Sequence, residues 1–274
     1  MKIQILGTAA AEGWPGIFCG CNTCQRARAT GGKDIRSRSG LMINDNIKVD
    51  LNSDIFHHVA THGLDLSLLE HIVFTHSHND HFDPPEFQYL APVFSHGRKH
   101  PIVSVWASED VIGLILKDYP EPVARPGLDV HAVKPFTAVE LGEVKATPIP
   151  AVHRDEELCL NWIFGGLDNA VLYASDTGPY DEKTWEFLSS AKFDLVISEC
   201  TYGFMADNDK HMSVPAVRKM RDRMLKQGCL KDGYRFVITH FSHNMGLLHH
   251  EMEERVIQDG FIVAYDGIVL EGGA

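Results

Sequence analysis

The densest group of potential metal ligands lies in one short polar segment of the sequence. Four such residues fall within six positions, namely His76, His78, Asp80 and His81. Imidazole nitrogens and carboxylate oxygens suit zinc, manganese, iron or nickel, and a site that leaves one coordination position open for water is catalytic. A solvated histidine-rich loop is the alternative, and further ligands at later strand ends favour the metal site over it.

Three polar residues stand just past the ends of apolar runs that predict short buried strands. They are His76 after residues 72–75, Asp176 after residues 171–174 and His240 after residues 236–239. Strand ends at one edge of a sheet are where α/β folds gather ligands, because loops converge there while the strands hold them in place. Asp176 alone would more often be a turn residue before Gly178. The presence of His76 and His240 at equivalent strand ends favours a metal ligand instead.

A second group of potential ligands is made of thiols. Cys19, Cys21 and Cys24 have a spacing that suits tetrahedral zinc and lacks one ligand. His243, three residues after His240, is the candidate for the fourth position. Three unlinked reduced cysteines are the alternative, but thiols clustered this tightly favour a metal. We therefore expect a structural zinc site at the loop 19–24.

Alternating apolar runs and helical patterns predict the elements that position these side chains. Strands are expected at 3–6, 72–74, 102–106, 171–173, 195–197, 236–238 and 261–264. Helices are expected at 54–62, 108–118, 181–190 and 213–227, with N-caps at Ser108, Asp181 and Ser213. The proline-rich stretch 119–127 predicts a loop. Strands mixed with helices predict an α/β fold with sheets covered by helices, organised as a single domain over residues 1–274.

Composition and charge exclude several classes of protein. Of the 274 residues, 44% are hydrophobic and 23% charged, and no apolar run is long enough to cross a bilayer. The first seven residues fit a strand better than a secretory signal, so we expect a cytoplasmic protein. The formal charge of −12 disfavours a nucleic acid polymer as partner. A small anionic substrate is compatible with it, because two divalent ions would dominate the local field.

The pattern His-x-His-x-Asp-His after an apolar strand resembles the signature of the metallo-β-lactamase superfamily. The resemblance implies a four-layer αβ/βα sandwich. It also implies three later ligands, which match His153 in Pro-Ala-Val-His, Asp176 in Ser-Asp-Thr-Gly and His240 in Thr-His. By that similarity, one metal ion would be held by His76, His78 and His153, the other by Asp80, His81 and His240, and Asp176 would bridge both.

The cysteine loop indicates which branch of the superfamily the chain resembles. Together with Gly-Thr-Ala-Ala at 7–10 and Thr-His-Phe-Ser-His at 239–243, it is similar to the cyclic phosphodiesterases of the carbon–phosphorus lyase pathway, which open a ribosyl 1,2-cyclic phosphate. That resemblance implies an additional zinc site made of three cysteines and one histidine. The pyrroloquinoline quinone biosynthesis protein B family has the same cysteine loop, but its catalytic metal motif is typically degraded, whereas the motif in this chain is intact.

A displacement at phosphorus leaves an alkoxide that an acid must protonate. His211, just before a predicted helix, is the best remaining candidate for this acid. The phosphodiesterase branch resembles the chain here too, with a histidine at this place and an acidic residue that matches Glu199. A carboxylate behind His211 would orient it and favour its charged form. A capping or surface histidine is the alternative.

The expected activity is hydrolysis of a small, cyclic phosphate diester by a metal-bridging hydroxide, with Asp80 among the catalytic residues and His211 as general acid. The cofactors would be two divalent ions (Zn, Mn, Fe or Ni) and one structural Zn, and a homodimer is expected because relatives are commonly dimers. The alternatives are a thioester or lactone hydrolase, a tRNA 3′-processing endonuclease and a non-catalytic carrier in cofactor biosynthesis. Arg36 and Arg38 either contact a phosphate or lie on a solvated edge, and the sequence does not decide between these.

Overall fold

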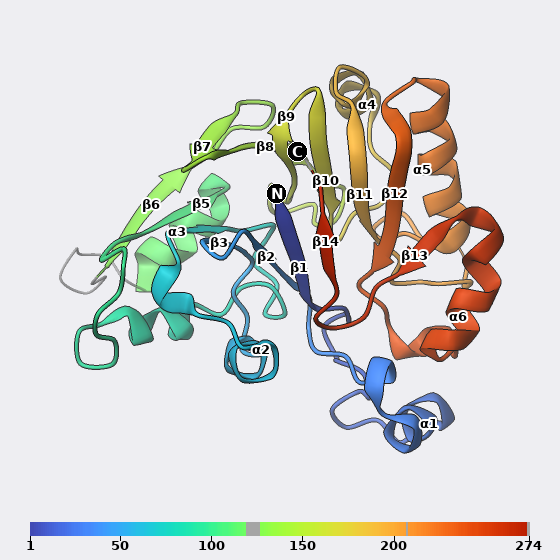
Figure 1. The fold of residues 1–274 in the computed structure, drawn as a ribbon, viewed down its shortest axis with the longest axis horizontal. Helices are drawn as coiled ribbons and strands as arrows, with labels where there is room; N and C mark the ends of the chain where they lie inside the picture. Colours follow the sequence, from blue (N-terminus) through green and yellow to red (C-terminus); the bar gives the residue numbers. More distant parts are fainter. Residues whose placement is uncertain (119–126, 207, 273–274) are drawn as a thin grey trace.

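Two seven-stranded sheets face each other in the computed structural model, which describes residues 1–118, 127–206 and 208–272 (Figure 1). The first sheet has the strand order β14 (Val269–Glu271), β1 (Lys2–Gly7), β2 (Gly40–Ile43), β3 (Ile47–Val49), β4 (His71–Val73), β5 (Val103–Ala107) and β6 (Leu128–Ala132). The second has the order β13 (Phe261–Val263), β12 (Leu230–Thr239), β11 (Phe193–Glu199), β10 (Asn169–Ala174), β9 (Leu160–Gly166), β8 (Val144–Pro150) and β7 (Val139–Leu141).

Helices cover the outer faces of both sheets (Figure 1). Helices α2 (Ile55–His62) and α3 (Glu109–Asp118) pack on the first sheet, and α4 (Glu182–Ser189), α5 (Val214–Lys226) and α6 (His249–Val256) pack on the second. The central core lies between the sheets, where Ile5 and Val49 of one sheet meet Trp162 and Val237 of the other. This arrangement confirms the four-layer αβ/βα sandwich expected from the sequence.

The predicted helices begin at the expected capping residues. The Asp181 carboxylate accepts a hydrogen bond from the Thr184 amide at 2.8 Å, and the Ser213 hydroxyl accepts one from the Ala216 amide at 3.2 Å. Each of these bonds satisfies an amide that the first helical turn leaves unpaired. No helix in the described parts of the chain is long and apolar enough to cross a membrane.

Several elements were not predicted from the sequence. They are α1 (Asn22–Thr30) and the strands β2, β3, β6, β7, β8, β9 and β14. Many of these strands are three to five residues long, which is too short for a pattern that stands out from chance, so their identity depends on the sheet that receives them. The loop expected at 119–127 lies, except for Gly127, outside the described residues.

Parallel pairing brings the functional segments together. Strands β3, β4 and β5 run parallel in the first sheet, and β10, β11 and β12 run parallel in the second. The carboxyl ends of parallel neighbours lie at one edge of a sheet, and polar residues follow or end these strands: Asp50, His76, Asp176, Glu199 and His240. The fold therefore delivers them to one place between the two sheets.

Candidate active site

Three histidines converge at the end of β4 and β8. The Nδ1 atom of His78 lies 3.0 Å from Nε2 of His76 and 2.9 Å from Nε2 of His153. The three rings meet nearly edge to face, and their nitrogens lie close enough together to ligate one ion. The structure thus brings together the three residues expected to share the first metal ion.

A second group contains two histidines and two aspartates. The Nε2 atom of His81 lies 3.3 Å from Oδ2 of Asp80 and 2.6 Å from Oδ2 of Asp176. The Nε2 atom of His240 lies 3.1 Å from Oδ1 of Asp176 and 3.6 Å from Oδ2 of Asp80. Asp176 also reaches the first group, since its Oδ2 is 3.5 Å from Nε2 of His76. Its position between the groups is the one that a bridging ligand requires.

Hydrogen bonds fix the tautomers of two of these histidines through Asp50. The Nδ1–H of His81 donates to the Asp50 carboxylate at 2.7 Å, because a carboxylate only accepts. The Thr75 hydroxyl donates to the same carboxylate at 2.9 Å, so its oxygen accepts from Nδ1–H of His76 at 3.0 Å. Both rings therefore direct Nε2 toward the site, as metal-binding histidines do.

Two more histidines are oriented in the same way from the second sheet. The Thr201 hydroxyl donates to Glu199 at 2.6 Å and accepts from Nδ1–H of His240 at 2.8 Å. The Nδ1–H of His153 donates to the backbone oxygen of Lys210 at 3.3 Å. These bonds again direct Nε2 toward the centre, so a set of imidazole nitrogens faces two carboxylates. That donor set fits a pair of divalent cations.

The pKa values in the two groups differ in a way that suits metal binding. Burial, and next the neighbouring His81, hold the pKa of His76 well below its usual value, and burial also lowers the pKa of His153. These rings are neutral, which metal ligation requires. Burial opposes the charged form of His81 as well, but the carboxylates of Asp80 and Asp176 raise its pKa well above the usual value. A metal cation in this group would neutralise the two carboxylates, as the proton on His81 does when no metal is bound.

Three residues of the centre have a left-handed backbone. The φ angles are 58° at Asp50, 30° at Asp176 and 56° at His240. Such angles are uncommon for residues with a side chain and cost roughly 1–3 kcal/mol each. The turns at the strand ends therefore aim these side chains inward at a cost in stability, which is typical of functional sites.

His211 lies beside the metal-binding groups and is paired with Glu199. Its Nδ1 donates to Oε1 of Glu199 at 2.8 Å and lies 3.5 Å from Oδ1 of Asp176. Glu199 is fully buried and is held by the amides of Thr177 at 2.9 Å and Thr201 at 3.1 Å. Burial opposes the charged form of His211, but Glu199 raises the pKa of the ring to about 9. The expected pairing of these two residues is present in the structure.

The groups open onto a cavity of about 470 Å³. Its wall is formed by metal-binding groups and by residues of the segments that follow β1, β11 and β12: Ala10, Ala11, Glu12, His78, Asp80, His153, Thr201, Tyr202, Met205, His211, His240, Ser242 and Asn244. The Tyr202 ring stacks on His211 with 6.0 Å between centroids. A ligand of modest size in this cavity would touch the metal-binding groups and His211 at once.

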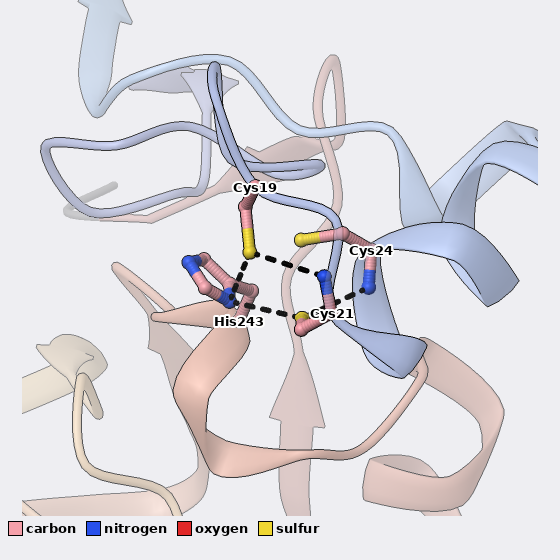
Figure 2. A group of neighbouring side chains, drawn as sticks. All are labelled: Cys19, Cys21, Cys24 and His243. Carbon is pink, nitrogen blue, oxygen red and sulfur yellow. Dashed lines mark hydrogen bonds between the residues drawn. The ribbon is translucent and has the colours of Figure 1, made fainter.

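The cysteine loop and His243 form a separate group at the surface (Figure 2). Nδ1 of His243 lies 3.6 Å from Sγ of Cys21 and 4.0 Å from Sγ of Cys19. The amides of Cys21 and Cys24 point at the sulfurs of Cys19 and Cys21, at 3.4 Å each. Figure 2 shows the three thiols and the imidazole around a common space, joined from segments more than 200 residues apart.

The chemistry of this group fits a thiolate-bound zinc ion. The Cys24 amide lowers the pKa of the Cys21 thiol to about 6, whereas burial raises the pKa of Cys24 to about 11. Neighbouring thiols cannot all ionise without a cation to neutralise them. Space is also restricted, because a Cβ at Gly16 would lie 3.0 Å from both the Cys19 Cβ and Nε2 of His243. The glycine lets the loop close over the four side chains.

Arg36 and Arg38 do not line the cavity. Arg36 is buried, and its guanidinium donates to the Thr8 hydroxyl and to the backbone oxygen of Ala264, both at 2.7 Å. Arg38 pairs with Asp54 at 2.9 Å. Both arginines tie loops together, a third outcome that the sequence did not suggest.

Several residues that support the site were not predicted from the sequence. Asp50 and Thr201 orient His81 and His240, and Glu12 enters the cavity from the N-terminal loop. Asp50 directly follows β3, so a prediction of that strand would have revealed it. Thr201 and Glu12 carry no comparable signal in the sequence.

One further close approach links the Asp176 turn to the segment before His211. A Cβ on Gly178 would collide with the backbone of Asp209 and would crowd the amide of Lys210 at 3.2 Å. The amide of Gly178 also donates to the backbone oxygen of Val152 at 2.7 Å, next to His153. The absence of a side chain at this position therefore allows three functional segments to pack together.

Comparison with known proteins identifies the class. A family model described as a beta-lactamase superfamily domain matches residues 49–241, which is more than half of the chain. The chain therefore belongs to the beta-lactamase superfamily, as its sequence motifs led us to expect, and together with the site this makes it a metal-dependent hydrolase. No curated protein matches the sequence.

Solved structures show the same fold at low sequence identity. A new diphosphatase from the PhnP family is 22% identical, with a TM-score of 0.76 over 98% of this chain and 97% of that one. Zn²⁺-bound PqqB from Methylobacterium extorquens is 14% identical, with a TM-score of 0.71 over 99% and 100%. The short form of human tRNase Z is 16% identical, with a TM-score of 0.65 over 99% of both chains.

Proposed function

We propose that the protein is a phosphodiesterase that hydrolyses a small, cyclic phosphate diester, with two divalent ions at the histidine–aspartate centre and His211 as general acid. The observation that carries this proposal is the 2.8 Å pair of His211 and Glu199 next to Asp176. This places a protonated imidazole at the wall of the cavity, beside the residues that would hold the ions. The similarity to a PhnP-family structure supports the same branch.

The ligands proposed for the two ions are those expected from the sequence. His76, His78 and His153 would hold one ion, Asp80, His81 and His240 the other, and Asp176 would contact both. When bound, such ions activate a water molecule and neutralise charge on the attacked phosphate. Cys19, Cys21, Cys24 and His243 would hold a structural zinc ion, which gives three metal ions per chain.

The chain's own contribution to the reaction is a proton at the leaving oxygen. With Nδ1 of His211 bound to Glu199, the other ring nitrogen has no hydrogen-bond partner among the described residues and can donate into the cavity. Glu199 is held by the Thr177 amide and the Thr201 hydroxyl, so the carboxylate cannot swing toward the metal site. His211 would thus protonate the departing alkoxide while Glu199 stabilises the charged ring before the transfer.

A second candidate is a phosphoric anhydride, because the similar PhnP-family structure is that of a diphosphatase. A phosphate leaving group is stable as an anion and gains little from an acid, whereas an alkoxide gains much. The buried carboxylate behind His211 is therefore better explained by a phosphate ester of an alcohol. Comparing turnover of a phosphoric anhydride with that of an alkyl phosphodiester distinguishes the two functions.

The test varies the leaving group in the metal-reconstituted protein. His211→Ala should lower kcat/KM for an alkyl phosphodiester by about 10²- to 10³-fold but for bis(p-nitrophenyl) phosphate by far less, since p-nitrophenolate needs no acid. His250→Ala, an exposed histidine of α6, is the matched control and should change neither value. Equal losses on both diesters, with metal content preserved, would remove His211 from the role of acid.

Acyl chemistry and a carrier role are separated in the same assays. Bis(p-nitrophenyl) phosphate is compared with a p-nitrophenyl ester, a lactone and a precursor tRNA. Turnover of the ester or lactone without any diester cleavage would identify an acyl hydrolase, and cleavage confined to the RNA would identify a processing nuclease. A chain that binds one metal ion and cleaves none of the four would be a carrier. The homodimer and the cytoplasmic location stay predictions, which light scattering and cell fractionation measure.

A further inference from the structure

Besides the metal-binding groups, the cavity wall includes an acidic and polar part. Glu12, Ser242 and Asn244 form it, and Tyr202 and Met205 also line the cavity. None of the lining residues in the described parts of the chain is a lysine or an arginine. A substrate would therefore meet hydrogen-bonding groups and one carboxylate here, without a cation to receive a second phosphate.

Glu12 is held in place from the C-terminal loop. The Ser242 hydroxyl donates to its Oε1 at 2.6 Å, and the amide of Asn244 donates to the same hydroxyl at 3.2 Å. Oε1 also lies 3.7 Å from Nε2 of His243. Within the described residues, no hydrogen bond reaches the other carboxylate oxygen, and the side chain is 32% exposed. Glu12 is thus a fixed acceptor with one oxygen left for a ligand.

Basic side chains adjacent to the cavity residues are already paired with acidic residues. Arg38, whose guanidinium donates to the backbone oxygen of Ala11 at 2.9 Å, binds Asp54. Arg154 binds Glu156 and Glu157, the latter at 3.1 Å, and Lys210 binds Asp155. None of these basic side chains lines the cavity. Relieving the charge of a second phosphate would require breaking one of these pairs.

We infer that the substrate carries a single phosphate, the reacting diester, joined to a neutral group whose free hydroxyl donates to Glu12. This inference rests on the proposed phosphodiesterase function and specifies its substrate class. A hydroxyl at this position gains a charge-assisted hydrogen bond, because its acceptor is a carboxylate already oriented by Ser242. A second phosphate at the same position meets the negative charge of Glu12 and is rejected.

The test uses adenosine 2′,3′-cyclic phosphate and two relatives that differ only at the 5′ position, which carries a hydroxyl, a hydrogen or a phosphate. For the wild-type protein, kcat/KM should be about tenfold or more higher with the hydroxyl than with the phosphate, and several-fold higher than with the hydrogen. Glu12→Gln should bring the hydroxyl and phosphate compounds to within about twofold. Glu254→Gln, which removes an exposed charge on α6, should keep the wild-type ratio.

A second variant works by gain of activity. Ala11 is exposed and lines the cavity, so Ala11→Lys adds a cation beside Glu12 without disturbing its contacts. It should raise kcat/KM for the 5′-phosphorylated compound and leave the ratio of the other two compounds near the wild-type value. Calorimetry with adenosine 3′-phosphate and adenosine 3′,5′-bisphosphate should show the same preference in binding alone.

The outcomes separate the two proposals. Equal turnover of the 5′-hydroxyl and 5′-phosphate compounds by the wild-type protein, or a ratio unchanged in Glu12→Gln, overturns the inference while the phosphodiesterase stands. Failure to cleave any diester, including bis(p-nitrophenyl) phosphate, overturns the phosphodiesterase and the substrate class with it. Loss of zinc from Glu12→Gln would show that the carboxylate supports His243 instead, and would also overturn the inference.

Discussion

The two groups of potential metal ligands are built on different supports. The histidine–aspartate centre is buried and lies at the ends of strands from both sheets. The cysteine group lies on a loop and the start of α1, with Cys21 exposed, Cys19 half-buried and Cys24 buried (Figure 2). In the centre, side chains such as Asp50 and Thr201 fix the ligand rings. In the cysteine group, backbone amides of Gly16, Cys21 and Cys24 are directed at the sulfurs. This difference indicates that the first group is built for precise geometry and the second for holding chain segments together.

The groups are nevertheless joined by one short segment. His240 belongs to the centre and His243 to the cysteine group, and Ser242 between them donates to Glu12. A displacement of the backbone in one group can therefore be transmitted to the other, because His240 and His243 are three positions apart. Mutations that act on one group at a time measure how independent the two are.

The largest effect is expected for Asp176→Asn. The amide loses the charge that Asp176 offers to both halves of the centre, so kcat/KM should fall by on the order of 10³-fold. Metal analysis should find the centre depleted and one zinc ion retained at the cysteines. Loss of all three ions would contradict the independence of the two groups.

Asp50→Asn should have a smaller effect on the same group. The amide no longer forces His81 to donate from Nδ1, so metal affinity or turnover should fall by roughly 10- to 100-fold. Asp45→Asn, at an exposed ion pair with Lys2, is the matched control and should be neutral. If both substitutions behaved alike in a metal titration, Asp50 would have no orienting role.

Cys24→Ser should affect stability more than turnover. The zinc content should fall by one ion per chain, and Tm should drop by roughly 10 °C, as expected when about 3 kcal/mol of metal-linked stability is lost. Turnover should fall less than tenfold, because the centre keeps its strand-end supports. Cys229→Ala, a buried cysteine outside both groups, should keep the full zinc content. A turnover loss as large as that of Asp176→Asn would break the distinction between the groups.

The smallest effect is expected far from both groups, at Asp181→Ala. Loss of the cap of α4 should reduce the free energy of unfolding by about 1 kcal/mol and leave metal content and turnover unchanged. The backbone hydrogen bond from Thr184 lowers the pKa of Asp181, so its contribution is present above the usual carboxyl pKa and is lost as the pH falls through the lower folded value. Denaturant unfolding at neutral and acidic pH should show the difference only at the higher pH.

Much of this site could be predicted because its ligands follow strongly apolar strands. His76, Asp176 and His240 each lie just after such a strand, and a short apolar run of this kind is typical of a buried strand. His243 could be paired with the cysteines only because it follows His240 so closely. Glu12 and Thr201 could not be predicted in the same way, since each acts through a contact with a distant segment that no local pattern specifies. The short strands β3 and β7 were missed for the same reason.

The close packing around Gly178 limits which residues the protein can tolerate at this position. Any side chain there must push away Asp209 and Lys210, which lead directly into His211. In a library of random variants selected for turnover, position 178 should therefore accept glycine and nothing else, as strictly as a ligand position does. A selection experiment would rank it among the residues of the active site, although glycine offers neither a ligand nor a proton.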